Sequence, residues 1–246
     1  MKGMILAAGY GERLRPETDK KPKPLFAIGQ TCMIRNAIGY LLRHGITEMA
    51  VNLHHLGHMI KEEISKNPPA GATIHFVNEA VIMGTAGGIK GAEPYIGDSD
   101  FVVINSDILV DLDLSRAIDF HREKKALAML VVRQNTEPQR TGVLEVADDG
   151  RLVRFLNARS PQYPPGKHYP PMMFTGIHIF AKEFFGCIPA GKPVNISTEV
   201  YPKLVESGAA VFALPHAGYW ADIGTPATYR AACEDINKGI FTPYGV

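Results

Sequence analysis

The chain has 246 residues, enough for one large domain with a substantial buried core. Its 26 basic and 25 acidic residues leave a net charge of +1, so net charge gives no support for binding to nucleic acid or to a membrane surface. The three cysteines lie far apart without a C-x-x-C pair, which indicates a reducing cytoplasmic setting rather than a disulfide framework. No apolar run approaches the ~20 residues of a membrane span, and the N-terminus does not read as a signal peptide.

The first half of the chain alternates strand and helix patterns. This alternation predicts an α/β fold, a Rossmann-like and mostly parallel mixed sheet flanked by helices on both faces. The expected strands are short apolar runs at 2–7, 48–53, 73–77, 101–104 and 126–132. The expected helices have apolar residues at helical spacing and lie at 33–44, 58–65 and 114–125.

The second half follows a different pattern. Three strand-like runs, at 142–146, 151–155 and 175–180, succeed one another without helices, which predicts antiparallel strands beside the sheet. A helix at 198–207 and a strand at 210–214 come next. Thr225-Pro226 then opens a last helix, because Thr is a favoured N-cap and Pro a favoured first helical residue. We predict a single domain over residues 1–246, with two parts that meet near residue 133.

A glycine-rich, basic loop follows the first predicted strand. It reads Leu-Ala-Ala-Gly-Tyr-Gly-Glu-Arg-Leu-Arg-Pro from Leu6 to Pro16 and continues to Lys23-Pro24. Gly9 and Gly11 can adopt positive φ and add no bulk, so backbone N–H groups beside them can face a bound anion. The loop lacks the Gly-Lys-Ser/Thr of a P-loop and the third glycine of the dinucleotide fingerprint, which excludes both. The charges that a polyphosphate would neutralise are Arg13, Arg15, Lys21 and Lys23.

This loop resembles the signature of the nucleoside-diphosphate-sugar pyrophosphorylases, the sugar-1-phosphate nucleotidyltransferases. The resemblance implies a GT-A-like fold and the reaction of an NTP with a sugar 1-phosphate to give an NDP-sugar and pyrophosphate. The nucleophile would be a phosphate oxygen that is already ionised, in direct in-line attack, so no general base is needed. The nucleotide-binding part would cover about 1–133 and the sugar-binding part about 134–246. Among the subfamilies, the chain looks most like the N-acetylmuramate- and mannose-1-phosphate nucleotidyltransferases. This resemblance favours UTP or GTP as the nucleotide donor.

The resemblance also implies roles for nucleotide-binding residues. Arg13 would bind the leaving pyrophosphate, and Lys23 the α-phosphate or the sugar phosphate; these two are the expected catalytic residues. A small-residue loop at 83–89, leading into a helix, would let the nucleobase lie against the backbone. Glu79 could accept hydrogen bonds from N–H groups of uracil or guanine, and fits equally well as a solvated strand-end acid. The expected nucleotide-binding residues are Leu6, Ala7, Ala8, Gly9, Gly11, Arg13, Glu79, Gly84, Thr85, Ala86 and Gly87.

Two acids are the expected Mg²⁺ ligands. Asp107 follows the most apolar predicted strand, and ligands of open α/β sheets bind beyond such strand ends. Asp222 lies in Trp220–Pro226, which resembles the family's Trp-x-Asp-x-Gly-Thr-Pro, whose Asp completes the metal site. Two carboxylates with phosphate oxygens and water form a usual Mg²⁺ environment. The alternative for each acid is a local turn or cap.

The sugar-binding side departs from the family pattern. Many relatives carry Glu-Lys-Pro after the strand at 151–155, where this chain has Asn157-Ala158-Arg159, so the sugar stays open. Glu199 fits the sugar pocket and fits equally well as an acid favoured in the first turn of a helix. The expected sugar-phosphate-binding residues are Lys23, Gly142, Asn157, Thr175 and Glu199.

Two other functional classes stay open. A GT-A-type glycosyltransferase would use Asp111-Leu112-Asp113 and would not need the basic loop. A catalytically silent sugar-nucleotide-binding regulatory protein would be expected to lose one of the cations or metal acids, and here all are present. His54, His55 and His58 have metal-ligand spacing but lack the intervening Glu of H-E-x-x-H, so we expect no metal there. The Pro-rich loop at 161–171 fits a subunit contact or a lid, which leaves a homo-oligomer open.

Overall fold

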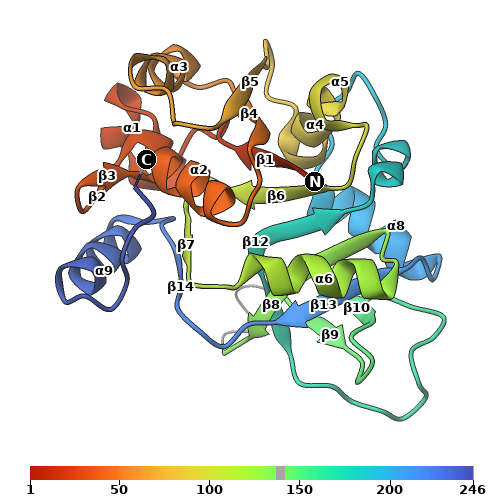
Figure 1. The fold of residues 1–246 in the computed structure, drawn as a ribbon. Coiled ribbons are helices and arrows are strands. Elements are labelled where there is room, and N and C mark those ends of the chain that lie inside the picture. The colour runs from red at the N-terminus through yellow and green to blue at the C-terminus, as the bar shows by residue number, and fades with distance from the viewer. Residues whose placement is uncertain (137–141, 246) are drawn as a thin grey trace.

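A computed structural model describes residues 1–136 and 142–245. At its centre is a parallel sheet whose strands follow the order β6, β1, β4 and β5 (Figure 1). Ile5 of β1 pairs with Val51 of β4 on one side and Ile104 of β6 on the other. The bounds are β1 (Lys2–Leu6), β4 (Glu48–Leu53), β5 (Thr73–Asn78) and β6 (Phe101–Asn105).

The second half extends this sheet with a change of direction. β12 (Met172–Phe180) runs antiparallel to β6, and β8 (Ala128–Gln134) runs antiparallel to β12. β8 therefore points the same way as β6, and β13 (Val211–Pro215) is parallel to it. The outer antiparallel strands are β9 (Leu144–Val146), β10 (Leu152–Phe155) and β11 (Ala158–Arg159). The predicted fold class is confirmed, including antiparallel strands in the second half.

Helices cover both faces of the sheet because successive strand residues point to opposite sides. On one face, α2, α3 and α6 pack against side chains such as Ile5 and Val51. On the other, α4, α5 and α8 pack against Met4 and Ala50. The helices are α1 (Glu17–Lys20), α2 (Met33–Arg43), α3 (Gly57–Lys66), α4 (Gly84–Gly91), α5 (Glu93–Ile96), α6 (Leu114–Lys124), α8 (Tyr201–Glu206) and α9 (Pro226–Asn237). Throughout the described ranges, no helix is both long and apolar enough to cross a membrane.

Two small two-stranded sheets complete the fold, and neither is predicted from the sequence. β7 (Ile108–Val110) pairs with β14 (Trp220–Asp222), and β2 (Ala27–Ile28) pairs with β3 (Thr31–Cys32). After β14, the chain returns to the N-terminal half, where the Tyr229 hydroxyl of α9 donates to the Ala27 carbonyl at 2.7 Å (Figure 1). This return brings the motif at Trp220–Pro226 close to the basic loop that follows β1.

Some element boundaries differ from those predicted. The segment expected as a loop at 83–89 is the start of α4, which begins at Gly84. The helix predicted at 198–207 begins two residues earlier, as the wider turn η4 (Ile196–Val200) before α8. Thr225 caps α9 as predicted, since its hydroxyl accepts from the Thr228 N–H at 3.2 Å. The division of the domain near residue 133 remains a prediction, and residues 137–141 beyond it lie outside the described part.

The buried His178 makes stability depend on pH. Its Nδ1 contacts the Tyr201 hydroxyl at 2.6 Å, and burial lowers the pKa of its imidazole from 6.5 to about 3. Between these values the unfolded chain binds a proton that the folded protein does not. The free energy of unfolding therefore falls as pH falls from 6.5 toward 3, by about 1–2 kcal/mol per pH unit.

We expect His178→Gln to make this loss shallower, because Gln does not titrate. Urea unfolding at about pH 7 and about pH 5 measures the difference, even if the variant is less stable at both. His168→Gln, at an exposed position, is the control. An unchanged pH dependence in His178→Gln would assign the acid sensitivity to other groups.

Candidate active site

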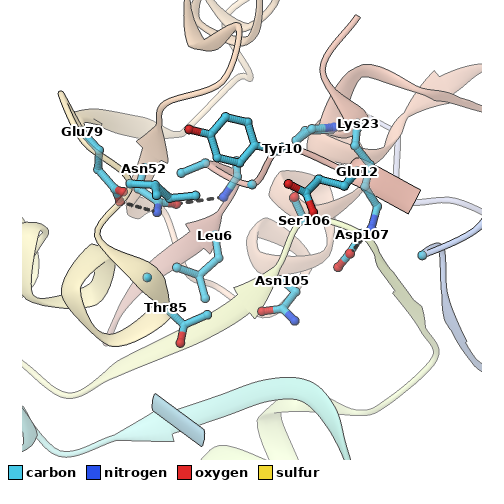
Figure 2. Close-up of a pocket in the computed structure, with 18 of the residues that line it drawn as sticks. Leu6, Tyr10, Glu12, Lys23, Asn52, Glu79, Thr85, Asn105, Ser106 and Asp107 are labelled. Atoms are coloured by element: carbon cyan, nitrogen blue, oxygen red, sulfur yellow. Dashed lines mark hydrogen bonds and ion pairs between the residues drawn. The ribbon is translucent and has the colours of Figure 1, made fainter. Parts of the chain in front are cut away.

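A cavity of about 700 Å³ lies at the carboxyl ends of the parallel strands. These ends meet at one edge of the sheet, so residues that directly follow the strands collect there. Figure 2 shows side chains from the loop after β1, from the end of β4 and from the end of β6 around this cavity. The expected nucleotide-binding residues that line it are Leu6, Ala7, Ala8, Gly9, Gly11, Arg13, Glu79, Gly84 and Thr85, and Lys23 and Asp107 line it as well.

The loop after β1 is shaped by Gly11. This residue has φ +65, and its carbonyl accepts hydrogen bonds from the Leu14 N–H at 2.8 Å and from the Thr18 hydroxyl at 3.1 Å. A side chain at this position would be strained by the positive φ and would also press on Thr18, 2.9 Å from its Cβ. The turn directs the following residues, including Arg13, along the cavity wall.

One end of the cavity is built by a hydrogen-bonded network around Asn52. Its Oδ1 accepts from the Ala7 N–H at 2.8 Å, and its Nδ2 donates to Glu79 Oε1 at 2.7 Å (Figure 2). The second oxygen of Glu79 accepts from the Met83 N–H at 2.8 Å, and the residue is only 9% exposed. Glu79 is therefore a buried acid that fixes the start of α4, rather than a solvated strand-end acid. The Ala7 N–H is already satisfied and is not free for a phosphate.

The start of α4 contributes less to the cavity than the sequence suggests. Gly84 and Thr85 line it, but the N–H groups of Ala86 and Gly87 both point to the Val194 carbonyl, at 3.0 and 3.2 Å. Ala86 and Gly87 lie outside the cavity lining because the segment around Val194 covers this end of the helix. Their expected contact with a nucleotide remains a prediction.

The two expected metal acids are brought together by the β7–β14 pair. Asp107 immediately precedes β7, Asp222 pairs with Ile108, and the Ile223 N–H donates to the Asp107 carbonyl at 3.0 Å. Lys23 forms an ion pair with the Asp107 carboxylate. Burial raises the pKa of Asp222, and the neighbouring Asp107 raises it further, while Lys23 and Arg13 act in the opposite direction. The two carboxylates are close enough to repel each other, and Lys23 and Arg13 partly offset this repulsion.

Arg13 lies against Gly224, the residue two positions after Asp222. A Cβ at Gly224 would lie 2.7 Å from the Arg13 Nη2 and 3.2 Å from the Asp222 Oδ2. Only a residue without a side chain lets the guanidinium approach the backbone here. Gly224 therefore links the C-terminal motif to the basic loop, although it was not among the predicted site residues.

We expect Gly224→Ala to displace Arg13 and to lower kcat by about tenfold or more, because small misplacements of a positioned group are costly. The thermal midpoint should change little, since the new methyl group meets the end of a flexible side chain. Steady-state turnover and a melting curve test both points. Gly186→Ala, where no atom lies within 4 Å of the added Cβ, is the matched control. Normal turnover of Gly224→Ala would argue against the placement of Arg13.

The four expected sugar-side residues other than Lys23 do not line this cavity. Thr175 is fully buried, and its hydroxyl donates to the Val131 carbonyl at 2.8 Å. Glu199 accepts from the Asn195 N–H at 2.7 Å, so it caps the turn that begins η4. Asn157 is exposed in the turn between β10 and β11, and Gly142 accepts from the Asn135 amide through its carbonyl at 2.6 Å. The side chains of Thr175 and Glu199 have structural partners, and the expected contact of these four residues with a sugar remains a prediction.

The other acidic and histidine motifs also have structural partners. Asp113 caps α6 by accepting from the Ser115 and Arg116 N–H groups, and Asp111 lies 2.9 Å from His216. His54 contacts the Glu79 carbonyl at 2.8 Å and the Tyr10 hydroxyl at 3.0 Å. Within 1–136 and 142–245, no cluster of three or more His, Cys, Asp or Glu side chains could hold a metal.

Several lining residues were missed by reasoning from the sequence. Asn52 could have been predicted from the sequence, because it is a single polar residue near the end of an apolar strand. Asn105 and Ser106 stand in the same short motif as Asp107 and could have been included with it. Tyr10 and Glu12 occupy the variable positions of the loop, where the pattern gives no guidance. The missed lining residues include Tyr10, Glu12, Asn52, Asn105, Ser106 and Gly224.

Comparison with known proteins agrees with this geometry. The family model described as nucleotidyl transferase matches residues 2–239. The chain belongs to this family. It is 33% identical over 251 aligned residues to a UTP–glucose-1-phosphate uridylyltransferase from Synechocystis sp., and 27% identical over 238 to a mannose-1-phosphate guanylyltransferase from Mycobacterium tuberculosis. Each alignment covers 96% of this chain. The family resemblance of the basic loop is thus confirmed.

Comparison with solved structures shows the same fold. The crystal structure of HddC from Yersinia pseudotuberculosis has a TM-score of 0.78 at 26% identity, with 96% of this chain and 99% of that chain covered. A second structure of HddC, complexed with GMP-PN, has a TM-score of 0.77. The chain spans only 63% and 65% of the two curated relatives above.

Proposed function

We propose that this protein is a sugar-1-phosphate nucleotidyltransferase that joins an NTP to a sugar 1-phosphate and releases pyrophosphate. The observation that carries the proposal is the meeting of four charged groups from three distant segments: three of them line one cavity, and the fourth, Asp222, lies beside Asp107. Arg13 and Lys23 come from the basic loop, Asp107 from the end of β6, and Asp222 from β14. Family membership supports the same reading.

The residues act by positioning and by neutralising charge. Two phosphate groups must approach each other, and Lys23, released from Asp107, would hold them in contact. Arg13 would stabilise the charge that develops on the leaving pyrophosphate. The attacking phosphate oxygen is ionised at neutral pH, so this mechanism needs no general base.

Asp107 and Asp222 fit a Mg²⁺ ion as the proposed cofactor. They are hard oxygen donors, and their mutual repulsion would be relieved by a cation. Mg²⁺ is typically held by one or two carboxylates together with substrate phosphates, which suits a site with two acids. A Mg²⁺ ion bound there would supply Lewis-acid stabilisation of phosphate oxygens.

UTP and GTP are the proposed donors. The relatives named above are a uridylyltransferase and guanylyltransferase, and HddC has been crystallised with GMP-PN. Uracil and guanine each present N–H donors. Glu79 lines the cavity with both oxygens already accepting one hydrogen bond, and each carboxylate oxygen has a second lone pair.

The test is pyrophosphate release from a grid of five NTPs (ATP, CTP, GTP, UTP and dTTP) against several sugar 1-phosphates, with Mg²⁺. We expect a signal only when all three components are present, strongest with UTP or GTP. Release of nucleoside diphosphate from an NDP-sugar would instead support a glycosyltransferase. Ligand-induced thermal shifts without any turnover would support the silent regulatory protein.

A further inference from the structure

Arg133, near the end of β8, is a cation that the proposed chemistry does not use. Its guanidinium lies 5.1 Å from the centre of the Trp220 ring, and its Nη1 donates to the Trp220 carbonyl at 3.4 Å. A guanidinium carries five N–H donors, so in the described part of the chain four are left without a partner. No carboxylate of that part pairs with the half-buried Arg133.

The sheet places Arg133 at the same edge as the proposed metal acids. β8 and β6 both run antiparallel to β12, so their carboxyl ends lie at the same edge. Arg133 is the second-last residue of β8, and Asp107 lies two positions beyond the last residue of β6. Across the strand pair, Arg133 stands opposite Met173 of β12. Arg133 therefore lies beside β12, at the sheet edge that carries the proposed metal acids.

Trp220 connects Arg133 with Asp222. These two residues are two positions apart on β14, so their side chains share a face and lie about 6–7 Å apart along the strand. The Trp220 Nε1 donates to the Thr175 carbonyl at 2.8 Å. The next residue, Gly176, lies against Asn105 of the cavity wall, whose Nδ2 would be 3.0 Å from a Cβ there. Trp220 thus connects Arg133 with Thr175, whose neighbour Gly176 lies against the cavity wall.

The charge of Arg133 is separate from the charges around the metal acids. The groups that shift the pKa of Asp222 are Asp107, Lys23 and Arg13, and Arg133 is not among them. The nearby Asp111 is engaged with His216 at 2.9 Å. An anionic group on the substrate could form a charge-assisted, bidentate interaction with this guanidinium, which a neutral group could not.

We propose that Arg133 binds an anionic group on the sugar ring, so that the substrate is a sugar 1-phosphate with a second negative charge, from a carboxylate or a second phosphate. This inference rests on the proposed function, because it places the 1-phosphate at Asp107 and Asp222. A sugar ring bound there extends past Trp220 toward Arg133. The planar fork of the guanidinium then meets the two oxygens of the anionic group.

Matched pairs of sugar 1-phosphates test the inference. With the NTP that gives the fastest turnover, glucose 1-phosphate is compared with glucuronic acid 1-phosphate and glucose 1,6-bisphosphate, and N-acetylglucosamine 1-phosphate with N-acetylmuramic acid 1-phosphate. We expect at least one anionic sugar to exceed its neutral counterpart in kcat/KM by about tenfold or more. Comparing the sugars that carry a carboxylate with the bisphosphate shows which of the two anionic groups Arg133 binds.

Arg133→Gln should abolish this preference by raising KM for the anionic sugar by about tenfold or more, with kcat and the KM for the NTP little changed. Arg133→Lys should restore part of it. Arg151→Gln is the matched control, because Arg151 also lies over an aromatic ring, 4.8 Å from the centre of Phe212, but directly precedes β10 and is not at the carboxyl end of β8.

The two proposals fail in different ways. Faster turnover of every neutral sugar, or a preference for the anionic sugar that survives in Arg133→Gln, would overturn the role of Arg133 and leave the proposed function intact. Absence of pyrophosphate release with every NTP and sugar would overturn the proposed function. In that case, calorimetric binding of glucuronic acid 1-phosphate to the wild type and Arg133→Gln still decides the role of Arg133.

Discussion

Replacing Arg13 by alanine is expected to lower kcat by about 10³-fold or more, the scale of cationic clamps in phosphoryl transfer. The side chain is exposed on the loop, lines the cavity, and lies against Gly224 and near Asp222. Its removal should therefore leave the fold and the thermal midpoint nearly unchanged. Steady-state pyrophosphate release and a melting curve measure the two effects separately.

Arg15→Ala is the matched control for this experiment. Arg15 belongs to the same loop and is also exposed, but it forms a surface ion pair with Asp19 at 3.2 Å and does not line the cavity. We expect its loss to change turnover by only a small factor. Near-normal turnover of Arg13→Ala, or equal effects of the two variants, would contradict the role given to Arg13.

The second large effect is expected for Asp222→Asn, with a fall in kcat of about 10²–10³, because a metal ligand supports several kcal/mol of charge stabilisation. Asparagine keeps the shape of the side chain, and the variant no longer carries a charge that burial and Asp107 disfavour. Stability should therefore be equal or higher. A Mg²⁺ titration should show that saturating metal does not restore full activity.

Asp111→Asn separates this prediction from the glycosyltransferase alternative. Asp111 belongs to the Asp-x-Asp motif, pairs with His216 and is not among the charged groups that act on Asp222. We expect the variant to retain turnover. A larger loss in Asp111→Asn than in Asp222→Asn would shift the metal site to the Asp-x-Asp motif and contradict the proposed function.

Sequence reasoning succeeded where the relevant residues are contiguous. The basic loop from Leu6 to Lys23 carries its own turn residues and charges, so its position after β1 and its place at the cavity followed from the pattern. The strand at 48–53 and the capped start of α9 are equally local, since hydrophobic periodicity and capping residues act over a few positions. These features depend on little beyond the neighbouring sequence.

Sequence reasoning was weaker where the direction of a side chain decides its role. In a strand, successive residues face opposite sides, so a shift of one position separates a core residue from a pocket residue. Thr175 turns inward to Val131, whereas the pattern allowed it to face the sugar. Glu79 is buried by its bonds to Asn52 and Met83, partners that lie on two different elements.

The sequence by itself determined the family, the α/β class and the identity of the four charged residues proposed for catalysis, because each lies in a short motif whose chemistry is local. Only the tertiary structure decided how these motifs meet. The β7–β14 pair sets Asp222 beside Asp107, and Gly224 sets the C-terminal segment against Arg13. Such contacts join residues more than 100 positions apart, and no periodicity or composition encodes a pairing over that distance.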